Sequence, residues 1–370
     1  MKIVIDSNIP FIKGALEPYA DIEYAEGREI NRHIIADADA VIIRTRTICN
    51  EELLKGSAVK FIGTASIGTD HIDLEWCRTA GIKCASAPGS NAGAVMQYLA
   101  SSLSYLIMKY GMDPSNTLMG LIGIGNVGSR VARMAETFGF SVLKNDPPRE
   151  RREGKEGFSS LDELLERSDI LSIHVPLTYE GRDKTFRLID ESVLSRLKDS
   201  AVLINTSRGP VIEEGSLTRC LKESKLGAAI LDVWNNEPFI SHELLALTEI
   251  GTPHIAGYSV DGKAKASEMI VRELAEYFKL PLKEWKPETL PAPDKPVIRL
   301  SEYDGTEPEL ISRAVRHTYR AEDDSMILKK KPEMFEKLRS DYRIRREFHA
   351  YKLTGNKPGT ADKLRIMGFK

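Results

Sequence analysis

A chain of 370 residues is longer than one ordinary domain, so two or three domains are expected. Apolar residues at 42% and charged residues at 29% are typical of a globular chain that can bury a proper core. The formal net charge of −2 argues against a general binder of nucleic acids or membranes, because such proteins usually carry a strong basic excess.

Short apolar runs alternate with helical patterns over the first part of the chain. Each run ends in small or polar residues, as strands do when they lead to a binding edge. The expected strands are residues 2–7, 38–45, 59–66 and 82–88. A long helical pattern follows at residues 91–111, and its length suggests a helix that crosses between domains.

A second series of strands and helices follows. The expected strands are residues 118–125, 140–146, 170–177, 201–207, 228–234 and 249–257, and the expected helices are residues 126–139, 160–169, 191–198 and 214–224. Alternating strands and helices predict a parallel sheet with helices on both faces. One more helix is expected at residues 262–279, and it would return to the first domain.

The pattern changes near residue 280. Residues 280–296 are rich in proline and indicate a linker. Beyond it we expect a strand at 297–303 and helical runs such as residues 332–348. The sequence therefore predicts an α/β fold with two Rossmann-like or flavodoxin-like parallel-sheet domains and a small C-terminal α+β domain. The expected division is 1–91 with 257–282, then 92–256, then 283–370.

A glycine-rich turn joins an expected strand to an expected helix. Gly123, Gly125 and Gly128 form the pattern GxGxxG, and Asn126 and Val127 open the helix. The first glycine permits a tight turn, the second lets the backbone approach a pyrophosphate, and the third lets helix and strand pack closely. The free N–H groups of the helix N-terminus favour phosphate. This context predicts a dinucleotide site.

The second strand of this unit ends at Asp146. A carboxylate there would bind the adenine ribose hydroxyls and repel a 2′-phosphate, which favours NAD over NADP. Its alternative reading is a turn residue before Pro147. Arg149 and Arg151 are close by in sequence and would tolerate a phosphate, so the preference for NAD stays open at this point.

Three charged or titratable residues follow later strands of the second series. They are Arg208, Glu237 and His254. In an open parallel sheet the binding crevice lies beyond the carboxyl ends of the strands, so these side chains should converge there. Histidine suits the base that takes the hydroxyl proton, a carboxylate orients the imidazole, and an arginine fork binds a substrate carboxylate. The set predicts oxidation of a small 2-hydroxy acid.

The motifs GIGNVG, NTSRGPVIEEGSL, LDVWNNEP and TPHIAGYS closely resemble the D-isomer-specific 2-hydroxyacid dehydrogenases. The resemblance implies the same roles for Arg208, Glu237 and His254. The stretches GTASIGTDHID, APGSNAGAV, NDPPR and LKKKPEMFEKLRSDYRIRREF resemble one branch of this family, which acts on a phosphorylated hydroxy acid and carries a C-terminal dimerisation domain. The implied partners are thus that substrate and a second copy of the chain.

The resemblance also carries over individual positions. It implies that Thr45, Ser66 and Tyr258 bind substrate, and that NAD contacts Asp146, Val175, Thr206, Ser207, Arg208, Asp232 and Gly257. The branch has Ser, Thr and Thr where this chain has Thr45, Ser66 and Val175. The first two changes keep a hydroxyl. Val175 does not, so only its backbone would contact the cofactor.

A substrate phosphate needs hydroxyls, N–H groups and a cation. The strand ends RTRT and TASIGTDH offer Arg44, Thr45, Arg46, Ser66 and Gly68, although the two arginines can also be solvated strand-end charges.

Two rival functions remain: a sister dehydrogenase acting on an acid such as 3-phosphoglycerate, and a non-catalytic scaffold that senses NAD. The basic residues from Lys329 onward favour a solvated helix face or a dimer surface over a patch that binds nucleic acid.

The four cysteines lack the spacing of a disulfide framework or a metal site, so we expect free thiols and no metal. The N-terminal residues read as a first strand and not as a signal peptide. The most apolar long segment, residues 95–108, is too short and polar to span a bilayer. These features predict a cytoplasmic protein without a membrane partner.

Overall fold

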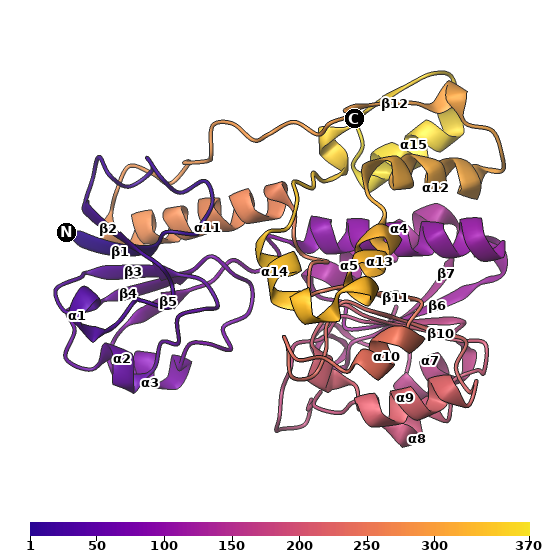
Figure 1. Ribbon diagram of the computed structural model, residues 1–370, viewed down its shortest axis with the longest axis horizontal. Coiled ribbons are helices and arrows are strands. Elements are labelled where there is room, and N and C mark those ends of the chain that lie inside the picture. Colours follow the sequence, from indigo (N-terminus) through magenta and orange to yellow (C-terminus); the bar gives the residue numbers. More distant parts are fainter. The chain divides into compact units, whose positions relative to one another are not determined.

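The computed structural model describes all 370 residues and divides them into two compact units. The first unit comprises Met1–Asn91 and Ser259–Pro291, and the second comprises Ala92–Tyr258 and Ala292–Lys370. Each contains one large parallel sheet with helices on both faces, which confirms the α/β class that the alternating pattern predicts. Figure 1 labels the elements along the chain.

The first unit is built on a five-stranded parallel sheet in the order β2-β1-β3-β4-β5, the flavodoxin-like order. Its elements are β1 (Lys2–Asp6), β2 (Asp21–Ala25), α1 (Arg32–Ile35), β3 (Ala40–Ile43), α2 (Glu51–Leu54), β4 (Phe61–Thr64), α3 (Leu74–Thr79), β5 (Lys83–Ala85) and α11 (Val260–Phe278). The sequence analysis missed β2, whose residues are only partly buried.

Alternate residues of these strands fill two cores, one on each face of the sheet. Ile3 and Ile5 pack with Ile270 of α11, whereas Val4 packs on the opposite face under α1 to α3. Gly63 permits the close approach of α11, because a Cβ there would lie 2.5 Å from Ile270 Cγ2. Figure 1 shows α11 lying along this sheet, and its residues come from after the second series of strands.

The second unit contains a six-stranded parallel sheet in the order β11-β10-β9-β8-β6-β7. Its strands are β6 (Leu118–Ile122), β7 (Ser141–Asn145), β8 (Ile170–Ile173), β9 (Val202–Asn205), β10 (Ala228–Leu231) and β11 (Ile250–Gly251). Its helices are α4 (Ala92–Tyr110), α5 (Asn126–Phe138), α6 (Pro147–Glu153), α7 (Leu161–Arg167), α8 (Glu191–Leu194), α9 (Glu214–Lys222) and α10 (His242–Leu247). Strand order reverses between β6 and β8, which is where such sheets bind ligands.

The C-terminal residues add two short parallel strands and several helices to this unit. They are β12 (Val297–Arg299), α12 (Glu307–Thr318), α13 (Ala321–Lys330), α14 (Phe335–Ser340), β13 (Lys352–Thr354) and α15 (Pro358–Met367). Ile311 and Leu364 join the core on one face of the six-stranded sheet, and Leu328 and Phe335 join the core on the other. The packing therefore ties residues 292–370 closely to the Rossmann-like fold.

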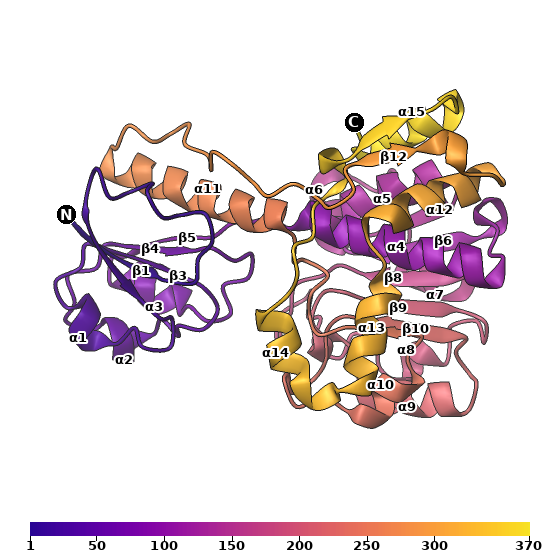
Figure 2. The ribbon, with the colours of Figure 1, turned by 45° about the horizontal axis from the view of Figure 1, so that its top comes forward.

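Helix α12 packs against α4, as Figure 2 shows, and α13 packs against the edge strand β11. The helical run expected over residues 332–348 is present only in part, because α14 ends at Ser340 and residues 341–347 are irregular. The backbone of this segment is held by contacts distant in sequence, such as the 2.9 Å hydrogen bond from Gln97 Nε2 to the Arg346 carbonyl. Apolar spacing cannot reveal such a contact.

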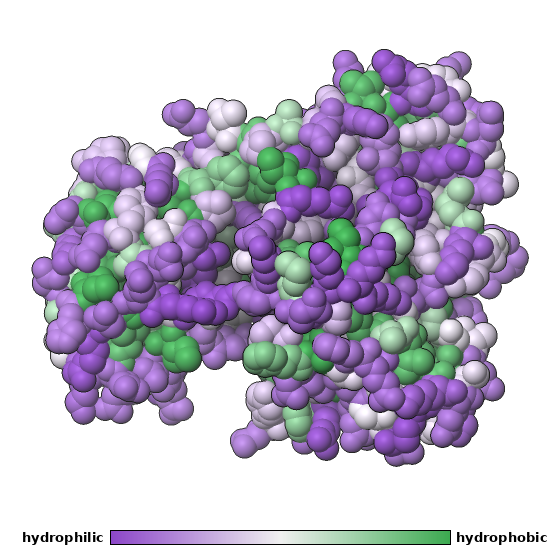
Figure 3. All heavy atoms as spheres, viewed as in Figure 1, coloured by the Kyte–Doolittle hydropathy of each residue, from purple (hydrophilic) through white to green (hydrophobic).

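The surface in Figure 3 is mostly hydrophilic, with hydrophobic side chains in small, separate groups. This distribution fits a chain in which 29% of residues are charged. Each helix of the structure is too short or too polar to cross a membrane. All four cysteines are free thiols, as their spacing predicts.

Candidate active site

The glycine-rich turn after β6 has the geometry that a pyrophosphate requires. Gly123 adopts a φ of +88°, and a Cβ there would lie 2.5 Å from the His174 carbonyl oxygen. A Cβ on Gly128 would lie 2.0 Å from the Gly123 carbonyl oxygen, whereas a Cβ on Gly125 would meet no atom within 4 Å. The first and third glycines thus permit packing within the protein, and Gly125 leaves its space to a ligand.

Helix α5 begins directly after Gly125, and no side chain caps its N-terminus. The N–H groups of Asn126 and Val127, its first residues, therefore remain for an anion, assisted by the helix dipole. An open glycine and an uncapped helix together fit the two phosphates of a dinucleotide.

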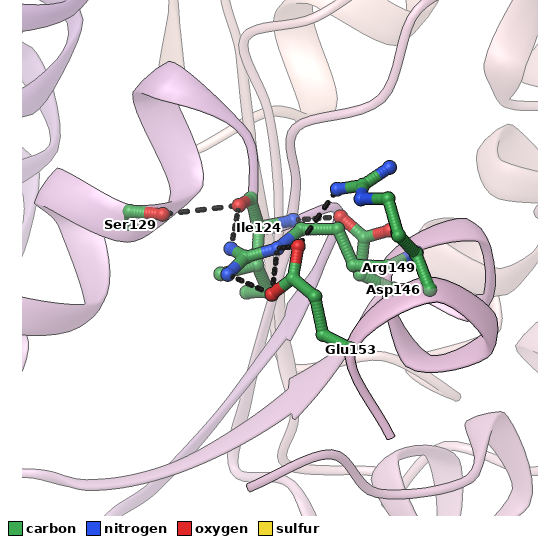
Figure 4. A network of polar contacts seen from close by, with 6 residues as sticks. Ile124, Ser129, Asp146, Arg149 and Glu153 are labelled. Carbon is green, nitrogen blue, oxygen red and sulfur yellow. Dashed lines mark hydrogen bonds and ion pairs between the residues drawn. The ribbon is translucent and has the colours of Figure 1, made fainter. Parts of the chain in front are cut away.

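Asp146 supports the glycine turn from the end of β7 (Figure 4). One of its carboxylate oxygens accepts the Ile124 N–H at 2.8 Å, and the other accepts the Arg149 N–H at 3.0 Å and so caps α6. Arg149 Nη1 in turn donates to the Ile124 carbonyl at 2.6 Å. From the sequence, Asp146 could be either a ribose-binding residue or a turn residue. The structure gives its carboxylate a structural role in fixing the turn, and this role is compatible with ligand binding.

The two arginines that could accommodate a 2′-phosphate are already paired with carboxylates. Arg149 forms an ion pair with Glu153, and Arg151 forms one with Asp183. Hydrogen bonds from Arg149 and Arg152 lower the pKa of Glu153 to about 2, so that carboxylate stays ionised. Because a carboxylate offsets the charge of each arginine, neither is readily available to a 2′-phosphate, which agrees with NAD as cofactor.

Val175 and Thr206 follow β8 and β9 at the same sheet edge. Val175 lies over the glycine turn, since its Cγ1 would be 2.9 Å from a Cβ on Gly123. The Thr206 hydroxyl is buried without a partner, and such an orphaned group fits a hydrogen bond to a bound cofactor. Asn205 orders the same loop, because its Oδ1 accepts the Ser207 N–H and hydroxyl and its Nδ2 donates to the Arg208 carbonyl.

A close backbone contact brings the loop carrying Arg208 against the loop carrying Glu237. A Cβ on Gly209 would lie 2.1 Å from the carbonyl carbon of Trp234, so only glycine fits there. Arg208 itself is half-buried, and its Nη1 donates to the Ser207 carbonyl at 2.8 Å.

Glu237 and His254 form a hydrogen-bonded pair. His254 Nδ1 lies 2.7 Å from Glu237 Oε2, while Glu237 Oε1 accepts the Trp234 N–H at 2.9 Å. Burial alone would raise the pKa of Glu237, but the charge and hydrogen bond of His254 outweigh burial and the pKa is lowered. The carboxylate therefore stays ionised and fixes Nδ1, which leaves His254 Nε2 to face a reactant.

Asp232 holds the backbone of the histidine loop. Its carboxylate is 1% exposed and accepts the Thr252 hydroxyl at 2.6 Å and the N–H groups of Ile255 and Ala256 at 2.8 Å. Burial raises the pKa of this carboxyl, although the charge of His254 and the donated hydrogen bonds act against burial. In this structure Asp232 orients the loop from inside the protein.

Tyr258 and Gly257 close the same loop. Both residues are half-buried, and the Tyr258 hydroxyl accepts a hydrogen bond from Arg339 Nε at 3.0 Å. Arg339 lies on α14, 81 positions further along the chain. The sequence analysis missed this arginine, because the basic tail suggested only a solvated or dimer surface.

Thr45 and Ser66 belong to the first unit and follow the neighbouring strands β3 and β4. Thr45 is exposed, and the Ser66 hydroxyl donates to the Gly68 carbonyl at 3.0 Å and shares a 2.7 Å hydrogen bond with Thr64. Arg44 forms a 3.0 Å ion pair with Asp6, which is fully buried. These residues share one sheet edge, and the charge of Arg44 is largely offset there.

Comparison with known proteins identifies the class to which this fold and site belong. Residues 105–256 match the model of the NAD-binding domain of D-isomer-specific 2-hydroxyacid dehydrogenases, and residues 290–368 match a domain of unknown function. The NAD-complexed D-lactate dehydrogenase of Aquifex aeolicus aligns with a TM-score of 0.63 and 27% identity over 76% of this chain and 97% of its own. The 3-phosphoglycerate dehydrogenase of Entamoeba histolytica aligns with a TM-score of 0.64 and 25% identity over 78% and 99%. The protein is an NAD-dependent oxidoreductase of this class.

More similar sequences define a narrower family. The erythronate-4-phosphate dehydrogenase of Bacteroides thetaiotaomicron is 47% identical over 96% of this chain and 100% of its own. That of Klebsiella pneumoniae is 38% identical over 100% of this chain and 98% of its own. The chain belongs to the erythronate-4-phosphate dehydrogenase family. The branch resemblance on which the sequence analysis relied is thereby confirmed.

Proposed function

We propose that this protein oxidises 4-phospho-D-erythronate to (R)-3-hydroxy-2-oxo-4-phosphooxybutanoate with NAD, an early step of pyridoxal 5′-phosphate (vitamin B6) biosynthesis. The observation that carries the chemistry is the 2.7 Å His254–Glu237 pair at the same sheet edge as the glycine turn and Arg208. The substrate rests on relatives of that name, which match nearly the whole chain.

Oxidation at C2 removes a proton from the hydroxyl and a hydride from the carbon. His254 Nε2 takes the hydroxyl proton, and the ionised Glu237 stabilises the imidazolium that results. The guanidinium of Arg208 binds the substrate carboxylate through parallel hydrogen bonds and sets C2 in place. The glycine turn would hold NAD, which would supply the hydride acceptor. The residues that would hold its pyrophosphate are Gly123, Gly125, Asn126, Val127 and Gly128, and those that would contact the rest of the cofactor are Asp146, Val175, Thr206, Ser207, Asp232 and Gly257.

The substrate would also be held by Thr45, Ser66 and Tyr258, whose hydroxyls suit a phosphorylated polyhydroxy acid. We assign residues 1–91 with 257–282 to a substrate (lid) domain, 92–256 to the NAD-binding domain and 283–370 to a dimerisation domain. The four free thiols fit a reducing compartment, and we place the reaction in the cytoplasm.

The test is NADH formation by the purified protein with NAD and 4-phosphoerythronate, 3-phosphoglycerate, D-lactate or D-glycerate. A parallel set receives an α-keto acid as acceptor, because bound NADH that leaves slowly would hide turnover. Strong preference for 4-phosphoerythronate supports the proposal. Preference for another acid would support the proposed mechanism but contradict the proposed pathway. Tight NAD binding without turnover would favour a non-catalytic scaffold that senses NAD.

We further propose a homodimer formed through residues 283–370. The side chains of Met326 and Ile327 on α13 are about half exposed, and that of Ile344 is 63% exposed, so this region offers apolar contacts to a second copy. Light scattering on the full chain measures the mass. A dimer that Ile344→Asp converts to monomer supports the assignment, and a wild-type monomer contradicts it.

A further inference from the structure

Helix α14 carries an arginine into the catalytic region of its own chain. Arg339 Nε donates to the Tyr258 hydroxyl at 3.0 Å, and its guanidinium carbon lies 5.7 Å from the centre of the Tyr258 ring. Its charge is also close enough to Glu237 to help lower the pKa of that carboxyl. Arg339 therefore lies beside the pair of residues assigned to proton transfer.

The position of this arginine is fixed by the core and not by a flexible tail. Phe335, on the same helix, is fully buried in the core under α7 to α10. The preceding helix α13 is bonded to the edge strand, because the Gly251 N–H donates to the Ser325 hydroxyl at 2.9 Å. Figure 2 shows α13 and α14 following one another along this side of the second unit. The guanidinium is thus presented on a rigid support.

The terminal nitrogens of Arg339 remain for a ligand. The hydrogen bond to Tyr258 uses Nε, and neither Nη1 nor Nη2 has a hydrogen bond or an ion pair in the structure. A half-buried guanidinium with a free fork matches the paired oxygens of a phosphate. Among the other cations considered for the substrate, Arg208 is assigned to the carboxylate and the charge of Arg44 is offset by buried Asp6. Arg46, the third, lies in the first unit and also has an interaction partner.

We propose that Arg339 binds the phosphate group of the substrate and so selects a phosphorylated hydroxy acid, an inference that rests on the function proposed above. The substrate carries one anion at each end, and the two arginines bind one each. The C-terminal region, whose family model is a domain of unknown function, then has a direct role in substrate recognition within its own chain.

The experiment compares kcat/KM for 4-phospho-D-erythronate and for unphosphorylated D-erythronate in wild type, Arg339→Gln and Arg339→Lys. Loss of a charged hydrogen-bond pair to phosphate predicts a fall of about 10- to 100-fold for the phosphorylated acid in Arg339→Gln, mainly through KM. The value for D-erythronate should change less than about threefold, because that substrate lacks the group recognised. For the phosphorylated acid, kcat/KM of Arg339→Lys should lie between the values of wild type and Arg339→Gln, since lysine keeps the charge but not the paired N–H donors.

The matched control is Lys337→Gln, which removes an equal charge from an exposed position of the same helix and should leave both values unchanged. Inorganic phosphate should inhibit wild type competitively and Arg339→Gln much more weakly, with KM for NAD unchanged in both. Equal losses for the two acids, or a change confined to NAD, overturn the role of Arg339. A wild-type enzyme without preference for the phosphorylated acid overturns the proposed function as well, so the two failures are distinguishable. Melting temperatures of all variants show whether each remains folded.

Discussion

The glycine-rich turn and the loops carrying Arg208, Glu237 and His254 lie at one edge of the same sheet, yet different forces hold them. The turn depends on backbone geometry, because Gly123 and Gly128 occupy places where a Cβ would collide with carbonyl oxygens. The catalytic loops depend on side-chain hydrogen bonds, chiefly those accepted by Asp232 and Glu237. A rigid backbone turn suits a large cofactor, whereas hydrogen-bonded side chains orient a catalytic base. Substitutions in the two regions should therefore affect different steps.

The largest effect is expected at the base. His254→Ala should lower kcat about a thousandfold, since general base catalysis contributes factors of this order, while NAD affinity stays near that of wild type. Steady-state kinetics and calorimetric titration with NAD measure the two quantities. His242→Ala is the control, because His242 is exposed on α10 and outside the site. Equal losses of turnover and NAD affinity would remove His254 from the role of base.

The next effect is expected at Arg208, which tests the carboxylate clamp. Arg208→Lys keeps the charge but loses the bidentate fork, so kcat/KM for the hydroxy acid should fall about 100-fold. The control is Arg219→Lys on α9, where the arginine forms an exposed ion pair with Glu191 and a hydrogen bond to the buried Ser216 hydroxyl, with no role assigned in the site. A wild-type kcat/KM in Arg208→Lys would contradict the assignment of Arg208 to the substrate carboxylate.

The same contrast explains what sequence could and could not predict. GxGxxG, the strand ends and the loop positions of Arg208, Glu237 and His254 are local features, so the fold class and the family followed from them. The internal bonds of Asp232 and the place of Arg339 depend on contacts 20 to 81 positions apart, which no spacing encodes. Asp146 was correctly placed at a strand end, but its support of Ile124 requires the folded turn.

A smaller effect separates the two kinds of glycine. Gly125→Ala adds a methyl group into open space, so stability should be unchanged while KM for NAD rises about tenfold, because the methyl lies where the pyrophosphate would approach. Gly209→Ala should instead lower the free energy of unfolding by roughly 1–3 kcal/mol, since its Cβ collides with the Trp234 backbone. Urea unfolding and NAD titration of both variants test the distinction. If Gly125→Ala were destabilised but bound NAD normally, the space beside Gly125 would not be the pyrophosphate site.

The smallest effect is a pH dependence of stability. The pKa of Glu237 in the folded protein lies below its ordinary value of 4.5, so the ionised carboxylate stabilises the fold above that pH, and this contribution is lost as the pH falls through the folded-state pKa. The difference in unfolding free energy between wild type and Glu237→Gln should therefore shrink between neutral pH and acid. Urea unfolding at several pH values measures it.

Glu214 supplies a control of opposite sign from the same set of loops. It accepts the Asn235 N–H at 2.6 Å, but burial raises its pKa, so its contribution is greatest below pH 4.5 and falls as the pH rises. The difference between wild type and Glu214→Gln should move in the opposite direction from that of Glu237→Gln. Parallel trends in the two variants would mean that general acid unfolding, and not the Glu237–His254 pair, sets the pH dependence. Opposite trends would show that each carboxylate responds to its own surroundings, with only Glu237 held ionised for the base.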